Sequence, residues 1–499
     1  MLINLKAMKS SNINTILANI VIAFMLATSL SSCGDDFLDI VPEDRIDKTT
    51  FYSTEQELVN AVNGIYAKQR VLYENTTTFF MQESRSDNAA LNQQDQPERV
   101  ASDVFQEFTS NQEMLRTWSL MYDVINHANA VIANDKEVSG DPGLIERLVA
   151  EAKFLRAFTY FQIVTSWGPV PLRLEPSTNF DDIIVPTSPA SDIYNRIVSD
   201  LTESMAVLPD EYDGSSANEV GRATKFSALT LLGKVELQRG NNTAAETALR
   251  QVIGEYSLLP NFEDIHAAGN NNTVESIYEV SFDPSGNTGY FVPVALIPVD
   301  EALRLGIAAG GNSAQILQIF PTQSLMDAFE PGDLRAGETF SIAVADNDPY
   351  FSKYMDISAS AQGHDINIVA LRYADVLLML AEAIGEGNEA YELINQVRRR
   401  GFGFDPNTPE PSVDINAATP GTFVDKLLHE RRVEFAMEHH RWNDLKRLRS
   451  PQEIVDLMKA QLLEQEGNNY AITTDDLLFP IPLLEVQIAE GAVTQNPGY

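Results

Sequence analysis

The sequence is short of positive charge. Its 499 residues include 35 Lys and Arg against 71 Asp and Glu, which gives a formal net charge of −36 at pH 7. Proteins that bind nucleic acid need a surplus of basic side chains to contact phosphates, so this imbalance argues against a nucleic-acid partner. For the same reason the folded chain is not expected to dock on an anionic lipid surface.

The sequence also lacks common catalytic and metal-binding motifs. It contains neither a Gly-x-x-x-x-Gly-Lys-Ser/Thr phosphate loop nor a Gly-x-Ser-x-Gly nucleophile turn. His429-Glu430 begins a zinc-protease pattern without its second histidine, and the adjacent His439 and His440 cannot share one helix face. We therefore expect no metal site and no cofactor. A glycosidase needs only two suitably spaced carboxylates, so among 71 acidic residues the sequence alone leaves that activity open.

Cysteine is nearly absent, and the single thiol follows an apolar stretch. That stretch, residues 16–30, is shorter than the roughly 20 residues that cross a bilayer, so it is typical of a signal peptide. It ends in Leu-Ser-Ser-Cys at Cys33, which resembles the cleavage site of bacterial lipoproteins. The resemblance implies an acylated Cys33, and several acyl chains give stable anchoring. The expected division is a signal peptide over 1–32, a lipidated cysteine and flexible tether over 33–45, and a single domain over 46–499.

Helical periodicity dominates the rest of the chain. The stretch "EAKFLRAFTYFQIVTSWGPVPL" from Glu151 has an aromatic stripe at helical spacing, and a helix from Leu115 is expected to pair with it. Two further helical hairpins are predicted, from Thr224 and from Leu371, each with a Gly-Asn turn. In the first of these, small and large packing residues occur where tetratricopeptide repeats place them: Leu232, Gly233, Ala245 and Leu249.

Two polar excursions interrupt the helical pattern. Residues 270–365 carry runs rich in Gly, Asn and Pro, with short strand-like pieces such as "SIYEVSF". Residues 73–112 form the second excursion. Because recognition commonly resides in loops on a rigid scaffold, we expect the segments 73–112 and 283–320 to face a ligand.

Five stretches together resemble the SusD/RagB family of Bacteroidetes surface lipoproteins. They are "EAKFLRAFTYFQIVTSWGPVPL", "ATKFSALTLLGKVEL", "LRYADVLLMLAEA", "HERRVEFAMEHHRWNDLKRL" and "LLFPIPLLEVQIAEGAVTQNPGY", in family order. The resemblance implies a mainly α fold, in which tetratricopeptide-like helical hairpins form a scaffold for a loop-rich, strand-poor, ligand-facing subdomain. Asp35, Asp36 and Asp39 behind the cysteine resemble a surface-export signal of such lipoproteins.

The resemblance also implies a function. Family members lie on the outer-membrane surface, facing the cell exterior, as a lid on a SusC-like TonB-dependent transporter. They capture an oligosaccharide or polysaccharide and deliver it to the transporter without performing chemistry, so no enzyme activity is expected. Some members bind peptides, and a peptide-binding lipoprotein of a RagAB-like uptake complex is the alternative. A surface hydrolase and a purely structural lid are the remaining alternatives.

The stretch from His429 is dense in ionisable residues. Glu430, Glu434 and Glu438 recur at four-residue intervals, which predicts one face of a single helix. Like charges at that spacing repel, so cations must lie nearby. Arginines of the same helix are candidates, as are Arg156 and Arg372 from other family motifs. We expect a structural ion-pair element, with Leu428, Phe435 and Trp442 in the core.

Sugar-binding sites use aromatic faces, and tryptophan offers the largest one. Trp118, Trp167 and Trp442 all lie in helical stretches, so neither excursion contains tryptophan. Starch-type family members use tryptophan in their platform, which weakens the expectation of a helical α-glucan ligand. The acidic composition favours a neutral glycan. The candidate ligand-binding residues are Tyr73, Arg85, Asp87, Asn88, Asn92, Tyr290, Phe291 and Asn312.

Overall fold

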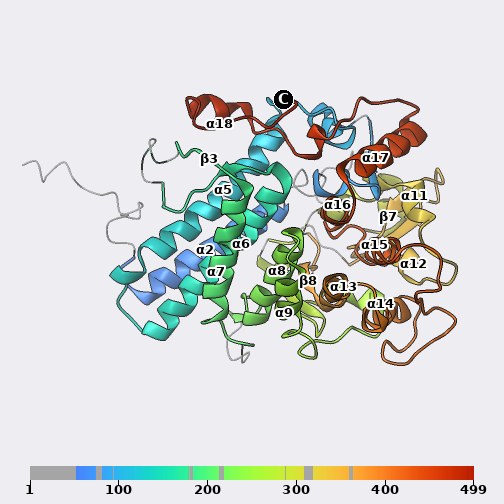
Figure 1. Ribbon diagram of the computed structural model, residues 1–499, viewed down its shortest axis with the longest axis horizontal. Coiled ribbons are helices and arrows are strands. Elements are labelled where there is room, and N and C mark those ends of the chain that lie inside the picture. The colour runs from blue at the N-terminus through green and yellow to red at the C-terminus, as the bar shows by residue number, and fades with distance from the viewer. Residues whose placement is uncertain are drawn as a thin grey trace, which may run out of the picture. The chain divides into compact units, whose positions relative to one another are not determined.

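Most of the fold consists of helices that pack against their neighbours in the chain (Figure 1). The computed structural model describes residues 52–74, 81–93, 95–177, 179, 182, 184–212, 219–286, 288–290, 292–307, 319–358 and 363–499. Contacts group Thr54–Tyr499 into one unit, apart from residues 1–53. The predicted signal peptide, Cys33 and the predicted tether therefore lie outside the described residues. No helix in the described ranges is long and apolar enough to cross a membrane.

The first half of the helical stack contains four long helices, each packed on the next. They are α2 (Glu55–Glu74), α5 (Gln112–Ala133), α6 (Pro142–Trp167) and α7 (Ala190–Met205), with α4 (Pro97–Asp103) and η2 (Asp135–Glu137) between them. The pair expected from Leu115 and Glu151 is α5 and α6. The Asp141 carboxylate accepts a hydrogen bond from Gly143 N–H at the start of α6, and Gly168, with φ of 72°, ends it. The predicted aromatic stripe of α6 is buried.

The second half continues the stack with the two other predicted hairpins. These are α8 (Lys225–Gln238) with α9 (Asn242–Leu249), and α13 (Tyr373–Ile384) with α14 (Asn388–Gly401). A Cβ added at Gly233 would lie 2.6 Å from the Leu249 side chain, closer than real atoms approach. Glycine there lets α8 and α9 approach each other, as the repeat pattern predicts. Because α9 also packs on α13, the excursion between the hairpins leaves the stack continuous.

The excursion is loop-rich and strand-poor, as predicted. It follows η5 (Phe262–Ile265), and its helical turns are η6 (Pro284–Gly286), η7 (Val292–Ala295), α10 (Val299–Leu305), α11 (Gln323–Met326) and α12 (Arg335–Thr339). The strands described pair antiparallel in twos: β1 (Ala89–Leu91) with β5 (Ile319–Pro321), β2 (Val170–Pro171) with β3 (Thr187–Ser188), β4 (Ser276–Val280) with β8 (Ile368–Arg372), and β6 (Phe340–Ile342) with β7 (Pro349–Phe351). Two of these pairs join segments far apart in sequence.

The prediction of one helix through Glu438 is wrong. The C-terminal elements are α15 (Phe423–Glu434), α16 (Arg441–Leu448), α17 (Pro451–Glu466), η8 (Asp475–Leu477) and α18 (Leu483–Ile488). Met437 and His439 adopt φ of 67° and 62°, in the left-handed region, which interrupts the helix. Glu438 therefore lies in the connection between α15 and α16, whereas Glu430 and Glu434 share α15.

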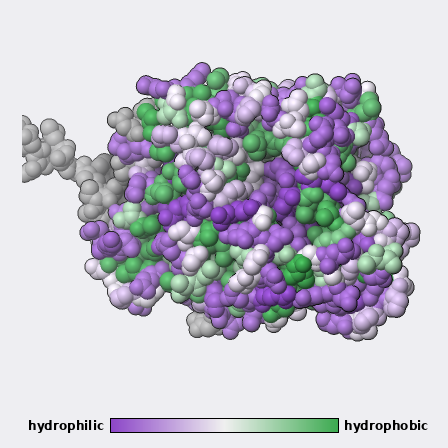
Figure 2. Space-filling model, in the orientation of Figure 1, coloured by the Kyte–Doolittle hydropathy of each residue, from purple (hydrophilic) through white to green (hydrophobic). Residues whose placement is uncertain are grey.

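The chain's C-terminus is held against the end of α6. The Asn496 side-chain amide donates hydrogen bonds to the carbonyl oxygens of Trp167, at 2.8 Å, and Phe479, at 2.7 Å. The face of the protein in Figure 2 is mostly hydrophilic, with apolar side chains in scattered groups, which agrees with the strongly acidic composition.

Candidate ligand site

An open cleft of about 600 Å³ lies on the loop-rich part of the fold. Its walls come from the segment after β1, the start of α10, β5, α11, the β6–β7 turn and the end of α17. We call it the α10 cleft. Both segments expected to face a ligand contribute to it, with Asn92 from the first and Phe320 from the second. A volume of this size is typical of small-molecule sites.

The pairing of β1 with β5 positions the aromatic wall of the cleft. Ala90 stands opposite Phe320 in this pair, and both alanines of β1 are buried. Thr322, the residue after β5, joins the two segments: its hydroxyl donates to the Asp87 carbonyl at 2.8 Å, and its N–H donates to the Asn88 carbonyl at 3.0 Å. The same hydroxyl accepts from Leu325 N–H and so caps α11. Phe320 is thereby held half-buried at the cleft wall.

The described lining of the cleft contains acidic side chains and no basic ones. The described lining residues include no Lys, Arg or His, whereas five are acidic: Asp300, Glu301, Asp346, Asp348 and Glu466. Hydrogen bonds from the nearby Arg304 lower the pKa of the buried Glu301 carboxyl to about 2, so this carboxylate is already compensated. Burial raises the pKa of Glu466. The other three carboxylates are exposed.

A second, much smaller hollow of about 70 Å³ lies beside Tyr73. The Tyr73 ring stacks on His439, with ring centroids 6.2 Å apart, and its hydroxyl accepts from the Gln162 amide at 2.7 Å. Burial lowers the pKa of His439 to about 4, so the ring is neutral near pH 7. This hollow has room for little more than ordered water.

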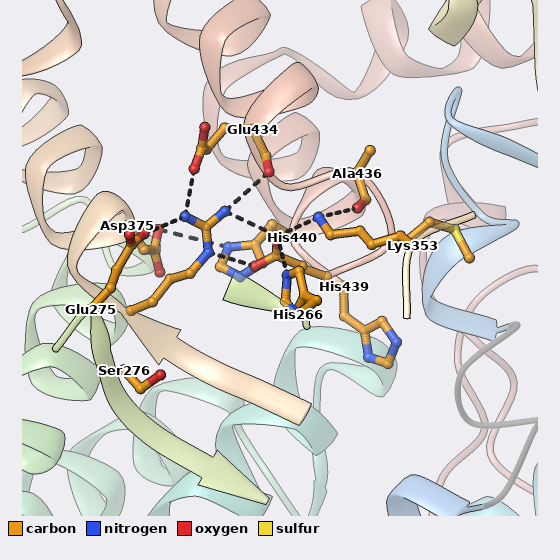
Figure 3. Close-up of polar contacts among 12 residues, drawn as sticks. His266, Glu275, Ser276, Lys353, Asp375, Glu434, Ala436, His439 and His440 are labelled. Atoms are coloured by element: carbon orange, nitrogen blue, oxygen red, sulfur yellow. Dashed lines mark hydrogen bonds and ion pairs between the residues drawn. The ribbon is translucent and has the colours of Figure 1, made fainter. Parts of the chain in front are cut away.

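The ionisable stretch from His429 is a buried ion-pair network (Figure 3). Arg372 contacts three carboxylates: Glu275 at 2.9 Å, Glu434 at 2.5 Å and Glu438 at 2.8 Å. Lys353 also contacts Glu438, at 2.5 Å. Burial alone would raise the pKa of Glu434, but the surrounding arginines outweigh it and lower that pKa to about 2. The structural interpretation of this stretch is confirmed.

Partners within the network differ in part from those expected. Arg372 does neutralise Glu434 and Glu438, but Arg156 instead binds Asp200 in α7, at 2.8 Å. Arg431 bridges Asp375 and Asp444, so it joins α13 to α16. Leu428, Phe435 and Trp442 are buried as predicted, although they do not share one helix. In the described ranges, no group of three or more His, Cys, Asp or Glu side chains is arranged to hold a metal ion.

Three of the predicted ligand residues are buried and bonded within the chain. The Arg85 guanidinium lies over the rings of Phe105 and Phe479, at 4.4 Å and 4.3 Å from their centroids. Asp87 accepts two hydrogen bonds from Arg441, at 2.7 Å and 2.8 Å, and Arg441 and Arg432 hold its pKa well below the usual range despite burial. Asn88 accepts from Arg432 at 2.9 Å. These side chains support the segment that carries the cleft wall.

The other predicted residues are dispersed. Asn92 lines the α10 cleft, Tyr73 lines the small hollow, and Tyr290 is buried against Phe282 and Tyr354. Phe291 and Asn312 lie outside the described residues. Ligand contact by all eight residues stays a prediction, and the structure brings only Asn92 to the large cleft among those it describes.

Phe320 and the acidic residues of the cleft are not among the ligand residues that the sequence predicts. Phe320 stands in a three-residue strand, too short for a periodic pattern, and its partner β1 lies more than two hundred residues earlier. Asp346 and Asp348 stand in "ADNDPYFSKY", one of the polar runs of the excursion, whose composition is typical of turns. Only the tertiary structure brings these segments to one cleft.

Comparison with known proteins finds SusD-like relatives that match nearly the whole chain. A model described as SusD family matches residues 335–499, and one described as "Starch-binding associating with outer membrane" matches residues 36–237. SusD-like protein P38 of Formosa agariphila is 27% identical over 93% of this chain and 96% of its own length. A SusD-like protein of Bacteroides ovatus is 26% identical over 84% of this chain and 80% of its own length.

Solved structures share the fold. A protein described as "Laminarin binding SusD-like protein" has a TM-score of 0.74 and 26% identity, covering 90% of this chain and 100% of that one. Surface glycan-binding protein A from Bacteroides thetaiotaomicron, in complex with laminarihexaose, has a TM-score of 0.71 and 18% identity, covering 89% and 100%. At that identity the second likeness concerns the fold alone.

Proposed function

The chain belongs to the SusD/RagB family, and we propose that it captures a glycan at the cell surface and passes it to a SusC-like TonB-dependent transporter. The observation that carries the proposal is the open α10 cleft, on a chain that is 26% identical over 90% of its length to a laminarin-binding SusD-like protein. The cleft offers binding groups, and the proposed role is capture without cleavage.

The residues of the cleft suit a sugar. The half-buried face of Phe320 can pack against sugar C–H groups, as aromatic rings do in carbohydrate sites. Asn92 and Gln323 supply amide groups, and the exposed carboxylates can accept hydrogen bonds from sugar hydroxyls. In this proposal Asp87 and Asn88 act as positioning residues, since their carbonyls hold Thr322 beside Phe320.

The proposal extends to location and partner. Cys33 would carry the lipid anchor at the outer membrane, residues 33–45 would form the tether, and residues 46–499 would form the domain facing the exterior. The description of one matching family model, which names association with the outer membrane, supports this location. We assign transporter contact to the helical hairpins. Replacing Cys33 by serine should release the protein from the membrane fraction while leaving its fold unchanged.

A binding panel tests the capture role. The chain from residue 34 onward, which keeps the whole unit Thr54–Tyr499, is titrated calorimetrically with laminarin, starch, other plant, host and fungal glycans, and a protein digest. Saturable binding of a glycan without product formation supports the proposal. Binding of the digest alone would favour the peptide alternative, and shortening of a glycan, abolished by one carboxylate substitution, would identify a hydrolase.

A further inference from the structure

Three carboxylates of the α10 cleft differ in exposure and in pairing from the buried carboxylates around Arg372. Asp300, Asp346 and Asp348 are exposed to solvent at the cleft, and none of them forms an ion pair with the residues that the structure describes. The one side-chain hydrogen bond found among them is a long one, from Asp348 N–H to Asp346 Oδ1 at 3.3 Å. By contrast, the carboxylates around Arg372 are all paired.

We propose that the α10 cleft sorts glycans by charge, so that it accepts uncharged or amine-bearing chains and rejects chains that carry carboxylate or sulfate groups. This inference rests on the proposed function, because it assumes that the glycan binds in this cleft. The selecting residues are Asp300, Asp346 and Asp348, which come from two different segments and border the same space as Phe320. Rejection by unpaired like charge is a recognised source of specificity.

The charge of these three carboxylates is not compensated by the described residues that line the cleft. Glu301 is neutralised by Arg304, so it adds little to the field in the cleft. The exposed carboxylates of Asp300, Asp346 and Asp348 act in the same direction on any charged group that enters, since no basic side chain in the described lining opposes them. At separations near 10 Å their effect is reduced but not removed by physiological salt, whose screening length is about 8 Å. A polyanionic chain would meet this repulsion at each charged unit.

A thiol reporter measures the charge of the cleft without any glycan. The chain from residue 34 onward has no cysteine, so Gln323→Cys, at an exposed position of the cleft, introduces a unique thiol. Its reaction rates with cationic trimethylammonioethyl methanethiosulfonate and anionic sulfonatoethyl methanethiosulfonate are compared. Substituting Asp300, Asp346 and Asp348 by asparagine should reduce the cation-to-anion rate ratio by on the order of tenfold at low ionic strength.

A matched control separates local from global charge. The triple variant Glu137→Gln, Glu211→Gln and Glu255→Gln removes the same number of exposed, unpaired carboxylates outside the cleft and should leave the ratio nearly unchanged. Equal effects of the two triple variants would overturn the proposal, because the cleft would then carry no charge preference of its own.

A second measurement tests the glycan itself. Wild type should bind laminarin, or another neutral glycan found by the panel, at least about tenfold more tightly than its carboxymethylated derivative at low salt, and the triple asparagine variant should lose most of that difference. Equal affinity of wild type for both forms would overturn the charge sorting while leaving the capture role standing. Failure of every glycan to bind would instead overturn the proposed function, whatever the cation-to-anion rate ratio of the thiol reporter shows.

Discussion

The hydroxyl of Thr322 donates a hydrogen bond to the carbonyl oxygen of Asp87 at 2.8 Å, across 235 positions of the sequence. This bond joins the two excursions from the helical scaffold, and the same hydroxyl caps α11 by accepting from Leu325 N–H at 3.0 Å. The wall of the α10 cleft therefore depends on one side chain that serves both segments.

Thr322→Val should lower the free energy of unfolding by about 1–2 kcal/mol, because it removes the cap of α11 and one hydrogen bond to the Asp87 carbonyl, which keeps the one from Arg432. It should also weaken glycan binding, since Phe320 lies in β5, two residues before Thr322, and is held in place by the same connection. Thr322→Ser keeps the hydroxyl and is the control. Urea unfolding and calorimetric titration provide the two readouts, and a valine variant as stable as the serine variant would contradict this role.

Arg372→Met should destabilise the fold by about 3–5 kcal/mol, because it leaves Glu275, Glu434 and Glu438 buried with too little positive charge. The control is Arg250→Met, which breaks exposed pairs with Glu246 and Glu389 and should cost at most about 1 kcal/mol. Denaturant unfolding measures the free energy of unfolding of both variants and of wild type. Similar losses for both variants would show that the network contributes no more than a surface pair.

Gly233→Ala should destabilise by about 1–3 kcal/mol, because the added methyl group would lie 2.6 Å from the Leu249 side chain between α8 and α9. Gly64→Ala is the matched control in α2, where nothing lies within 4 Å of the added carbon. There the higher helix propensity of alanine should stabilise by about 0.5–1 kcal/mol. The thermal unfolding temperature should fall for Gly233→Ala and rise for Gly64→Ala. A change of the same sign in both variants would refute the packing argument.

Acidification should destabilise the fold through its buried histidines. Burial lowers the pKa of His266 and His439 to about 4 and that of His440 to about 3, so between roughly pH 6.5 and these values the unfolded chain binds more protons than the folded one. Stability contributed by these neutral rings is present above pH 6.5 and is lost as pH falls. Glu83, whose pKa is raised to about 7 by burial, acts in the opposite sense and offsets one of the three.

His439→Asn isolates one of these contributions, because asparagine tolerates the left-handed backbone of this position. The variant's unfolding free energy, measured in urea at a series of pH values, should decline less steeply than that of wild type between pH 6.5 and 4. Curves that run parallel through this interval would mean that His439 does not titrate differently in the folded and unfolded chain.

The sequence predicted the scaffold better than the site. Helical hairpins are local, so the spacing of Gly233, Ala245 and Leu249 carried enough information to place α8 and α9. The break after Glu434 could not be seen, because left-handed φ at Met437 and His439 comes from tertiary contacts rather than from glycine or proline. Arg85 and Asp87 resembled ligand groups in a polar stretch, whereas the structure uses both to hold distant segments together.

Titration of the Phe320→Ala variant decides whether the α10 cleft holds the captured glycan. Using the glycan that the panel identifies, the variant should bind at least about tenfold more weakly than wild type, because the buried contact with the ring is lost. Phe404→Ala, which removes an exposed phenylalanine outside the cleft, should bind as wild type does. Unchanged affinity of a folded Phe320→Ala variant would mean that the glycan binds elsewhere and not in the α10 cleft.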